Sequence, residues 1–583
     1  MSSAASEIRP FTIALVQMPF APLKQAPLAL LQLQAAVEQR FGELVSVRIV
    51  YPSYDFASHL GLRLYYQIAY ADSDLRPGEM SGLGDWFFRH IAFPDVPENV
   101  DAYRQRYFGT PEQSGFVNFD DVLAKRVGAA SLLEEIIDRY DLRLTDLVGF
   151  TSMFAQHAAC LAMARLLKSA AVTPIVVIGG ANCEGPMGRA LANNVPDVDA
   201  VFSGPGLKSF PDFVRASMAG AVPGERRIRG VHTRRKATSA GATVKGGLAL
   251  AVLQPAAAPA TGVVHDDLGE ELDINVPLAL DYAGFLDTFE RAFNGTLDPV
   301  LTFETSRGCW WGAKAHCPFC GLNGSTMAYR AMQPRQAIAT FEQLFQHAAK
   351  CRVFECVDNI MPIDYPESVF PHITAPASTT IYYEVKADLT AADLASMARA
   401  GVRFIQPGIE ALATPSLRAL KKGTNAVGNV LLLRNCLALG VMPLWNLLIG
   451  IPREERPREI YAKYAADIPA MMHLPPPWTV FKVRVDRFSP YFTRPDEYGL
   501  RIRPKAFYNF VYPFDDDVLF DLAYYFDDAN AGTAEYAEAA DEWHPVLREL
   551  IREWFSGWCV ADATKRPALF VDNGRCTTHG AVR

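Results

Sequence analysis

Short hydrophobic runs alternate with helical patterns along the first third of the chain. The stretch 11–19 (FTIALVQMP) is apolar, and 28–41 repeats apolar residues at helical spacing. The predicted strands are 11–19, 45–52, 146–154, 174–183 and 198–206, and the predicted helices include 28–41 and 157–170. Apolar strands between helices, two of them ending in glycines, predict an open, parallel, doubly wound sheet. Such a sheet binds ligands at the carboxyl ends of its strands.

A second series of strands and helices begins near residue 299. Its predicted strands are 300–309, 352–362, 379–389, 402–410, 442–452 and 478–488, with helices at 390–401 and 427–440. About six strands with intervening helices predict a full or partial β/α barrel. Functional residues of such a barrel lie where its strands end, at their carboxyl termini.

The chain therefore belongs to the α/β class and divides into four predicted parts. They are a Rossmann-like sheet domain (1–232) with an aromatic-rich insertion at about 53–143, a linker and connecting segment (233–298), a β/α barrel (299–489) and a small α-rich C-terminal domain (490–583). The linker is rich in Ala, Gly and Pro up to residue 262 and has room for one short strand. We expect the C-terminal domain, with a helix at 542–558, to face the substrate.

Composition excludes some classes of protein. The 583 residues carry a net charge of −8, which disfavours a nucleic-acid partner. No apolar run reaches about 18 residues, the length of a membrane helix; the nearest, 430–451, is broken by Arg434 and Gly440. The N-terminal stretch lacks the pattern of a secretory signal. We expect a cytoplasmic protein with no membrane partner, in which clustered cysteines indicate metal binding or catalysis.

Three of the ten cysteines, Cys309, Cys317 and Cys320, lie within a dozen residues in the pattern C-x7-C-x2-C. Three thiolates can hold three irons of a [4Fe-4S] cluster and leave the fourth iron open to a small molecule. A structural zinc site needs a fourth ligand, and His316 is poorly placed beside Cys317. The remaining alternative is that all three are core cysteines.

The motif SRGCWWGAKAHCPFCGLNG (306–324) resembles the cluster loop of radical S-adenosylmethionine (SAM) enzymes. More narrowly, it is similar to the cobalamin-dependent group that matures ribosomally synthesised, post-translationally modified peptides. That group uses the longer cysteine spacing found here, whereas C-x3-C-x2-C is the commonest pattern of the superfamily.

The resemblance implies a set of SAM contacts. The open iron would chelate the amino and carboxylate groups of SAM, and Gly308, Gly312 and Gly321 would let backbone N–H groups approach the cluster sulfurs. The predicted SAM-binding residues are Phe319 near the adenine, Asp358 and Asn359 at the methionine amino group, Lys386 at the carboxylate or ribose, Gln406 and Glu410 at the ribose, and Asn446, with Gly450, on the adenine side. Alternatively, Asp358 caps a helix and Lys386 is solvated.

The doubly wound domain resembles the cobalamin-binding domain of one radical SAM class. The resemblance implies cobalamin contacts in the strand-end loops, at Ser152, Met153, Gly179, Gly180, Ala181, Gly204 and Gly206. The loop 18–30 after the first strand contains no His, so we expect cobalt to have no protein His ligand. His157 is interpreted as a capping or surface residue. The alternative is a sheet that serves only as a scaffold.

These features favour a radical SAM C-methyltransferase that uses a [4Fe-4S] cluster, SAM and methylcobalamin to methylate an unactivated sp3 carbon of a precursor peptide. Its other partner would be an electron donor such as flavodoxin or ferredoxin. One alternative is a radical SAM maturase that cyclises, epimerises or oxidises a peptide without methyl transfer, and another acts on a small natural product. A third is a non-catalytic peptide-binding scaffold.

The remaining cysteines and a late aromatic stripe are less informative. Apolar surroundings predict core positions for Cys160, Cys183, Cys351 and Cys436, and Cys356 lies on a strand beside the proposed SAM residues. Cys559 and Cys576 have no evident partner. Trp543, Trp554, Phe555 and Trp558 recur at helical spacing, which favours core packing over a peptide groove.

Overall fold

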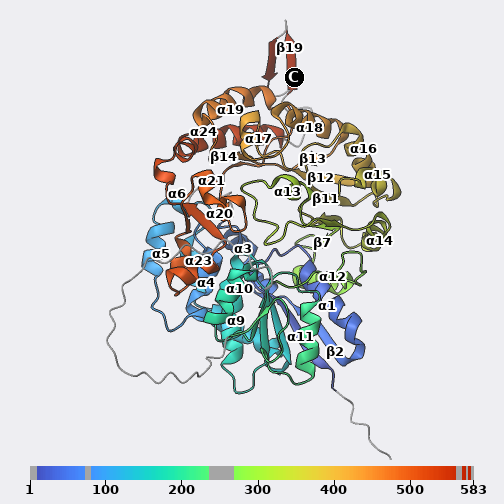
Figure 1. Cartoon of the computed structure of the whole chain (residues 1–583), viewed down its shortest axis with the longest axis vertical. Coiled ribbons are helices and arrows are strands. Elements are labelled where there is room, and N and C mark those ends of the chain that lie inside the picture. The colour runs from blue at the N-terminus through green and yellow to red at the C-terminus, as the bar shows by residue number, and fades with distance from the viewer. Residues whose placement is uncertain (1–8, 73–79, 235–267, 560–567, 573–574, 580–583) are drawn as a thin grey trace, which may run out of the picture.

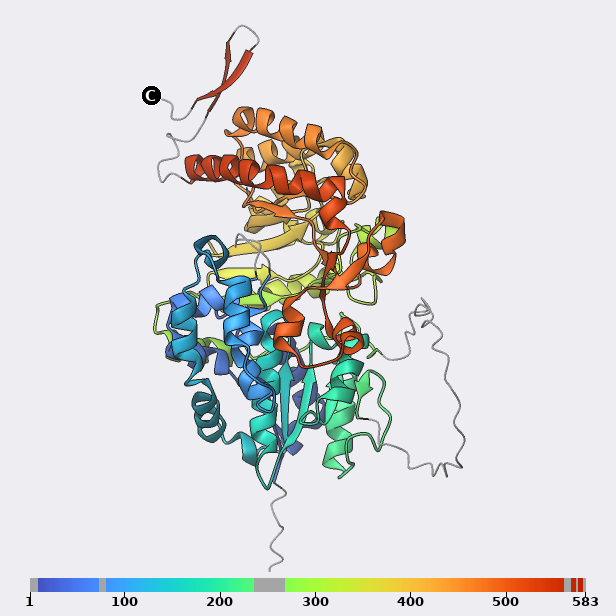
Figure 2. The ribbon, with the colours of Figure 1, turned by 90° about the vertical axis from the view of Figure 1, so that its left-hand side faces the viewer.

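A computed structural model shows the N-terminal sheet below, the barrel above it and the C-terminal segments along one side (Figures 1 and 2). The structure describes residues 9–72, 80–234, 268–559, 568–572 and 575–579. Most of the predicted linker, including the stretch expected to hold a short strand, lies outside the described residues. Within the described residues, no helix combines the length and apolar character needed to cross a membrane.

The first sheet has the strand order β2-β1-β3-β4-β5-β6, in which only β6 is antiparallel. Its strands are β1 (Phe11–Gln17), β2 (Val45–Val50), β3 (Leu147–Thr151), β4 (Ile175–Gly179), β5 (Ala200–Phe202) and β6 (Val231–His232). All five predicted strands are present, in a doubly wound arrangement. The chain moves from β1 outward to β2 and then returns to the other side of β1, which places the topological switch point between β1 and β3.

Both faces of this sheet are buried, which explains why its strands read as continuous apolar runs. Ile13 and Leu15 pack with one core, together with α1 (Leu28–Phe41) and α11 (Ser209–Met218), whereas Ala14 and Val16 join the main core. The remaining helices of the sheet are α9 (His157–Lys168) and α10 (Pro186–Asn194).

Between β2 and β3, the described residues form seven helices. They are α2 (Pro52–Leu60), α3 (Leu62–Ala69), α4 (Leu83–Ala92), α5 (Val100–Tyr107), α6 (Pro111–Ser114), α7 (Phe119–Arg126) and α8 (Ala129–Arg139). Their aromatic residues are part of the main core, and within it Trp86 stacks on Tyr103 with ring centroids 4.2 Å apart. Helix α4 packs against α9, which covers the first sheet, and against α22 (Phe507–Val511) of the C-terminal part (Figure 2). The insertion therefore connects the first sheet to the C-terminal part.

The second sheet is parallel, with the order β13-β12-β11-β10-β7, and a separate parallel pair, β14-β15, continues its curve. The strands are β7 (Val300–Phe303), β10 (Val353–Cys356), β11 (Thr380–Val385), β12 (Val402–Pro407), β13 (Met442–Pro443), β14 (Leu447–Ile449) and β15 (Val480–Lys482). The stretch predicted as one strand at 442–452 is divided into β13 and β14. A bridge between Glu410 and Leu447 links the two sheets into an open, partial barrel.

Helices cover the outside of this barrel (Figure 1). They are α12 (Tyr282–Phe293), α14 (Pro334–Phe345), α15 (Tyr365–Ser368), α16 (Ala391–Ala400), α17 (Thr414–Ala419), α18 (Ala426–Leu439) and α19 (Pro457–Met471). The predicted helices at 390–401 and 427–440 correspond to α16 and α18.

The segment after β1 covers the free edge of the barrel sheet. Ala26 N donates to Val300 O at 2.9 Å, and Val300 N donates to Lys24 O at 2.8 Å, beside strand β7. Thr302 Oγ1 adds a hydrogen bond of 2.6 Å to Ala26 O. Strand β7 therefore has hydrogen-bonding neighbours on both sides, and the first sheet is tied directly to the barrel.

The C-terminal part combines a small antiparallel sheet with one long helix. Its elements are β16 (Val485–Asp486), α20 (Pro490–Thr493), α21 (Pro495–Tyr498), β17 (Ile502–Pro504), α23 (Asp516–Leu522), β18 (Tyr525–Asp528), α24 (Glu535–Trp558), β19 (Ala568–Asp572) and β20 (Arg575–His579). The helix predicted at 542–558 is the second half of α24. Trp554 and Trp558 are buried, and Trp554 donates to Leu474 O at 2.9 Å, which confirms a core role for these two residues.

Burial also confirms the predicted core cysteines. Cys160, Cys183, Cys351 and Cys436 are all fully buried, and Cys356 is 1% exposed beside Thr305. Cys559 is exposed at the end of α24.

Candidate functional site

A cavity of about 330 Å³ opens at the carboxyl ends of the barrel strands, and we call it the cysteine cavity. Cys309, Cys317 and Cys320 all line it. Most of the predicted SAM residues line it too, namely Phe319, Asn359, Lys386, Gln406, Glu410 and Asn446. The tertiary structure thus gathers side chains from the cysteine loop and from the ends of four strands.

The cysteine loop is held by its own backbone. Cys309 is the N-cap of the short helix α13 (Trp310–Ala315), and its Sγ accepts a hydrogen bond from Gly312 N at 3.2 Å. Cys320 N donates to Cys317 O at 3.1 Å, which closes a turn between these two cysteines. The His316 ring lies outside the cavity lining, with Nε2 2.8 Å from Cys320 O. Among the described residues, no three His, Cys, Asp or Glu side chains are grouped to hold a single metal ion.

The loop glycines serve close backbone packing. A Cβ at Gly308, whose φ is +78°, would lie 2.2 Å from Ala328 O, and one at Gly321 would lie 2.1 Å from Arg487 O. The two strands β8 (Ser306–Arg307) and β9 (Arg330–Ala331) pair beside Gly308. These contacts give a reason for glycine that is independent of any approach to cluster sulfurs.

Two of the thiols lie in a largely desolvated setting. Burial raises the pKa of the Cys320 thiol to about 12 and also raises the pKa of Cys317, which the nearby ammonium of Lys422 partly offsets. Ligation by iron requires thiolates, so loading a cluster here would release protons.

A buried ion pair forms one wall of the cavity. Lys422 Nζ lies 3.2 Å from Glu410 Oε1 and 5.8 Å from the ring centroid of Phe319. Glu410 takes a left-handed backbone conformation, with φ +57°, immediately after β12. Beside it, burial and the Glu410 carboxylate raise the pKa of Glu384 to about 7.

Sequence reasoning did not single out Lys422 or Glu384. Lys422 stands in the turn sequence KKGTN, which looks like a solvated loop, and Glu384 is the first of three consecutive residues, 384–386, that line the cavity where β11 ends.

Lys386 is placed by the cysteine loop. Its Nζ lies 4.3 Å from the ring centroid of Trp311 and donates to Asp388 Oδ2 at 2.7 Å. The side chain is therefore buried in a cation–π contact with the loop rather than solvated.

Two amide side chains line the same cavity. Gln406 Oε1 accepts a hydrogen bond from the Tyr382 hydroxyl at 3.0 Å. Within the described part of the chain, no donor reaches the buried Oδ1 atom of Asn446. A buried acceptor without a donor is costly, so this atom points to a ligand group that would supply one.

Asp358 does not line the cavity. Its carboxylate is 1% exposed and accepts hydrogen bonds from Thr305 N at 2.7 Å and Thr305 Oγ1 at 2.6 Å. Burial raises its pKa to about 6. The neighbouring Asn359 faces the cavity instead and donates to Asn323 Oδ1 at 2.9 Å.

A second cavity, of about 300 Å³, lies between the first sheet and helices α1 and α11, and we call it the sheet cavity. Of the predicted cobalamin contacts, it contains Gly179, Gly180, Gly204 and Gly206, and it also contains Gly149. A Cβ at Gly149 would lie 3.2 Å from Leu15 Cδ2, and one at Gly179 would lie 3.2 Å from Phe202 Cβ. The glycines therefore keep this face of the sheet open.

Three predicted cobalamin contacts lie elsewhere. Ala181 is exposed and Ser152 is fully buried beneath the loops, with Oγ 2.9 Å from His157 Nδ1. Met153 lines a third cavity, described below. The interpretation of His157 as a surface residue is wrong, because its ring is 3% exposed.

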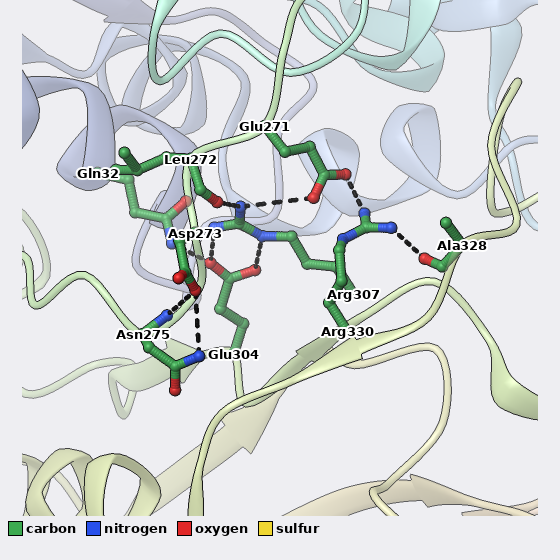
Figure 3. Close-up of polar contacts among 9 residues, drawn as sticks. All are labelled: Gln32, Glu271, Leu272, Asp273, Asn275, Glu304, Arg307, Ala328 and Arg330. Carbon is green, nitrogen blue, oxygen red and sulfur yellow. Dashed lines mark hydrogen bonds and ion pairs between the residues drawn. The ribbon is translucent and has the colours of Figure 1, made fainter.

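A network of charged side chains connects the wall of the sheet cavity to the start of the cysteine loop (Figure 3). Arg307, two residues before Cys309, donates from Nε to Glu304 Oε2 at 2.9 Å and from Nη1 to Leu272 O at 3.1 Å. Glu304 also accepts from Gln32 Nε2 on α1 at 2.5 Å. Glu271 pairs with Arg330, which lies opposite Arg307 across β8 and β9. The start of the cysteine loop is thereby fixed to α1 and to the connecting segment.

The residues present fit the groups that the sequence motif implies. Three thiols face one cavity, each able to bind one iron of a four-iron cluster, and the unpartnered Asn446 Oδ1 lies in the same space. The glycine-lined sheet cavity opens toward the strand ends, where doubly wound sheets bind cofactors.

Comparison with known proteins supports the fold. No family model matches the chain, and no curated protein matches it. Among solved structures, the cobalamin-dependent SAM radical enzyme OxsB with aqua-cobalamin and SAM bound matches with a TM-score of 0.52 and 13% identity, over 96% of this chain and 70% of that one. In its apo form OxsB is matched over only 49% of its length, with a TM-score of 0.46.

A second solved structure is the radical SAM methyltransferase TsrM from Kitasatospora setae with cobalamin and a [4Fe-4S] cluster bound. It matches with a TM-score of 0.48 and 15% identity, over 83% of this chain and 74% of that one. At 13% identity, the likeness to OxsB with aqua-cobalamin bound shows the fold alone: a mostly parallel α/β sheet domain followed by a β/α barrel and a C-terminal helical region.

Proposed function

We propose that the protein is a cobalamin-dependent radical SAM methyltransferase that methylates an unactivated sp3 carbon of a ribosomally made precursor peptide. The observation that carries the proposal is the cysteine cavity, in which the three cysteines meet six of the residues expected to bind SAM. The sheet cavity on the same chain supports the proposal of a second cofactor, and so does the fold shared with OxsB, whose solved structure has aqua-cobalamin bound.

The cofactors would supply the hard chemistry: one-electron cleavage of SAM at the cluster and a methyl group carried by cobalamin. The protein's own residues bind, orient and exclude water. Cys309, Cys317 and Cys320 would hold the cluster. Asn446 Oδ1 would accept a hydrogen bond from SAM, and the paired Lys422 and Glu410 would present fixed charges to its polar groups.

The cobalamin proposal assigns the nucleotide tail to the sheet cavity. Gly179, Gly180, Gly204 and Gly206 would contact it, with no His ligand to cobalt. The peptide substrate and a low-potential donor, flavodoxin or ferredoxin, are part of the same proposal and rest on the resemblance of the motif at 306–324.

Anaerobic reconstitution with iron, sulfide and hydroxocobalamin tests this function. After desalting, we expect about four irons per chain and a retained corrin absorption band. Cys309→Ala, Cys317→Ala and Cys320→Ala should each lose the iron, whereas Cys559→Ala, at an exposed cysteine, should keep it. Iron without corrin would contradict the cobalamin assignment, and absence of both would contradict the whole proposal.

The mass of the peptide product separates methyl transfer from other radical chemistry. With the precursor peptide, SAM and a reductant, we expect a gain of one methylene unit for each methyl group installed. A product that has lost two hydrogens, or an isobaric epimer, would point to cyclisation, oxidation or epimerisation instead.

A further inference from the structure

A third cavity, of about 370 Å³, lies where the first sheet, the insertion and the C-terminal part meet. Met153 and His157 come from the end of β3 and the start of α9, Asp85 comes from α4, and Tyr512 follows α22. Arg484 lines both this cavity and the cysteine cavity, so the two are neighbours. We call it the aromatic cavity, because its walls include Phe20, Tyr66, Phe154, Phe507, Tyr524 and Tyr525.

Most polar side chains of the aromatic cavity are already paired. Asp85 accepts from Ala158 N at 2.9 Å and from the Tyr512 hydroxyl at 3.1 Å. Asn182 donates to Ser152 Oγ at 3.0 Å and to Phe154 O at 2.9 Å. Arg484 binds Asp486 and stacks 4.8 Å from the ring centroid of Tyr525.

His157 is different. Its Nδ1 lies 2.9 Å from Ser152 Oγ, but its Nε2 is buried and, among the described residues, has no hydrogen-bond partner. Ser152 Oγ already accepts the Asn182 amide, so the economical assignment is that the serine hydroxyl donates to His157 Nδ1. Burial lowers the pKa of His157 to about 4, which keeps the ring neutral. This assignment puts the ring proton on Nε2, which gives His157, a residue of the cavity wall, an N–H donor without a partner among the described residues.

The surroundings of this donor define the acceptor it would take. The carboxylate of Asp72 lines the same cavity and would repel an anion. Ser81 N, Ser81 Oγ and Gly82 N all donate to the Oδ1 atom of Asp72. A planar, neutral group with a carbonyl on one side and N–H on the other fits these surroundings. Its carbonyl matches the His157 donor, its N–H matches the acidic side chain, and its flat shape matches the aromatic walls.

From these contacts we infer that the aromatic cavity binds a carboxamide, whose carbonyl accepts the His157 Nε2 hydrogen and whose apolar remainder packs on the aromatic walls. This inference rests on the proposed function, which brings two sources of amides close to this place. One is the set of side-chain amides around the corrin of cobalamin, and the other is an amide of the peptide substrate.

Binding measurements on the full chain distinguish these sources. The probes are hydroxocobalamin and 3-phenylpropanamide, with the carboxylate 3-phenylpropanoate as the anionic counterpart. His157→Phe keeps a ring and removes the donor. His372→Phe, at an exposed histidine of the barrel, is the matched control. Affinities are measured by ultrafiltration for cobalamin and by ligand-observed NMR for the small amide.

If a corrin amide fills the cavity, His157→Phe weakens hydroxocobalamin binding about tenfold, and cobalamin displaces the small amide. If a peptide amide fills it, hydroxocobalamin affinity is unchanged in His157→Phe, and the small amide binds cobalamin-loaded wild type but not the variant. The inference is overturned if His157→Phe, like the control His372→Phe, binds both hydroxocobalamin and the small amide with wild-type affinity.

Two further comparisons guard the test. Preference of wild type for the amide over the carboxylate needs no variant and is expected about tenfold, and equal binding of the two would count against the inference. His157→Gln, which restores an N–H donor, should recover part of the affinity. If the proposed function is wrong, the reconstituted wild-type protein will contain no iron or no corrin. Binding of the small amide can still be measured on that protein, so the two failures are distinguishable.

Discussion

Trp311 lies directly against Gly423: a Cβ added at Gly423 would come within 2.2 Å of the Trp311 Cη2 atom. The same indole donates from Nε1 to Lys421 O at 3.0 Å and carries the Lys386 ammonium on its face. The cysteine loop and the turn after α17 are thus fitted to each other, and residues of both line the cysteine cavity.

Gly423→Ala should therefore displace Trp311 and loosen the cysteine loop. We expect at least a fivefold weaker affinity for SAM in the reconstituted protein, measured by equilibrium dialysis. Gly440→Ala is the matched control, because Gly440 has nearly the same positive φ, +66° against +67°, with open space around its Cβ position. Both variants should lose about 1 kcal/mol of stability from the left-handed backbone. Equal SAM affinities in the two variants would contradict this reading.

Asp358 and Asn359 are adjacent but should have opposite phenotypes. Asp358→Ala leaves the Thr305 amide and hydroxyl without their acceptor in the core, so we expect a loss of about 2–4 kcal/mol in unfolding free energy. Asn359→Ala should leave stability within about 0.5 kcal/mol and weaken SAM binding. Denaturant titration and SAM dialysis on both variants check the pair. A stable Asp358→Ala protein with weakened SAM binding would restore the sequence-based role of Asp358.

The charged network of Figure 3 should hold the cysteine loop to the sheet. Arg307→Met leaves Glu304, whose side chain is 13% exposed, without its guanidinium, and we expect a loss of about 2 kcal/mol. Arg552→Met removes an exposed i,i+3 pair with Glu549 and should cost under about 0.5 kcal/mol. Thermal unfolding of both variants tests the difference. Equal midpoints would show that the network contributes no more than a surface pair.

The pH dependence of stability should reveal Asp85. Burial raises the pKa of its carboxyl from 3.8 to about 7 in the folded protein, so the folded state holds the proton more tightly than the unfolded state. Its contribution to stability is thus largest below pH 4 and is lost as pH rises toward 7. Relative to Asp85→Asn, wild type should lose about 2 kcal/mol between pH 5 and pH 7.5. The measurement is the unfolding free energy of both proteins at both pH values. A difference between wild type and Asp85→Asn that is the same at pH 5 and pH 7.5 would contradict the prediction.

Much of the fold follows from local patterns. The apolar runs at 11–19 and 174–183 became strands because both faces of a parallel sheet are buried, and such strands need no polar alternation. The cysteine spacing and the glycine-ended strands likewise indicated the strand ends at which two cavities are found. The predicted strand at 442–452 was divided in two, since the barrel turns away there and only Leu447 is bridged to Glu410.

The orientation of individual side chains was decided by tertiary contacts. Sequence order alone placed Asp358 and Asn359 together, but the strand end turns one toward Thr305 and the other toward the cavity. His157 read as a surface residue, and its burial comes from Tyr512, which lies more than three hundred residues away along the chain. The sequence determined which elements form and which loops carry thiols and glycines, because these depend on local periodicity and spacing. Only the packing of distant segments decided which polar atoms are satisfied and which face a cavity.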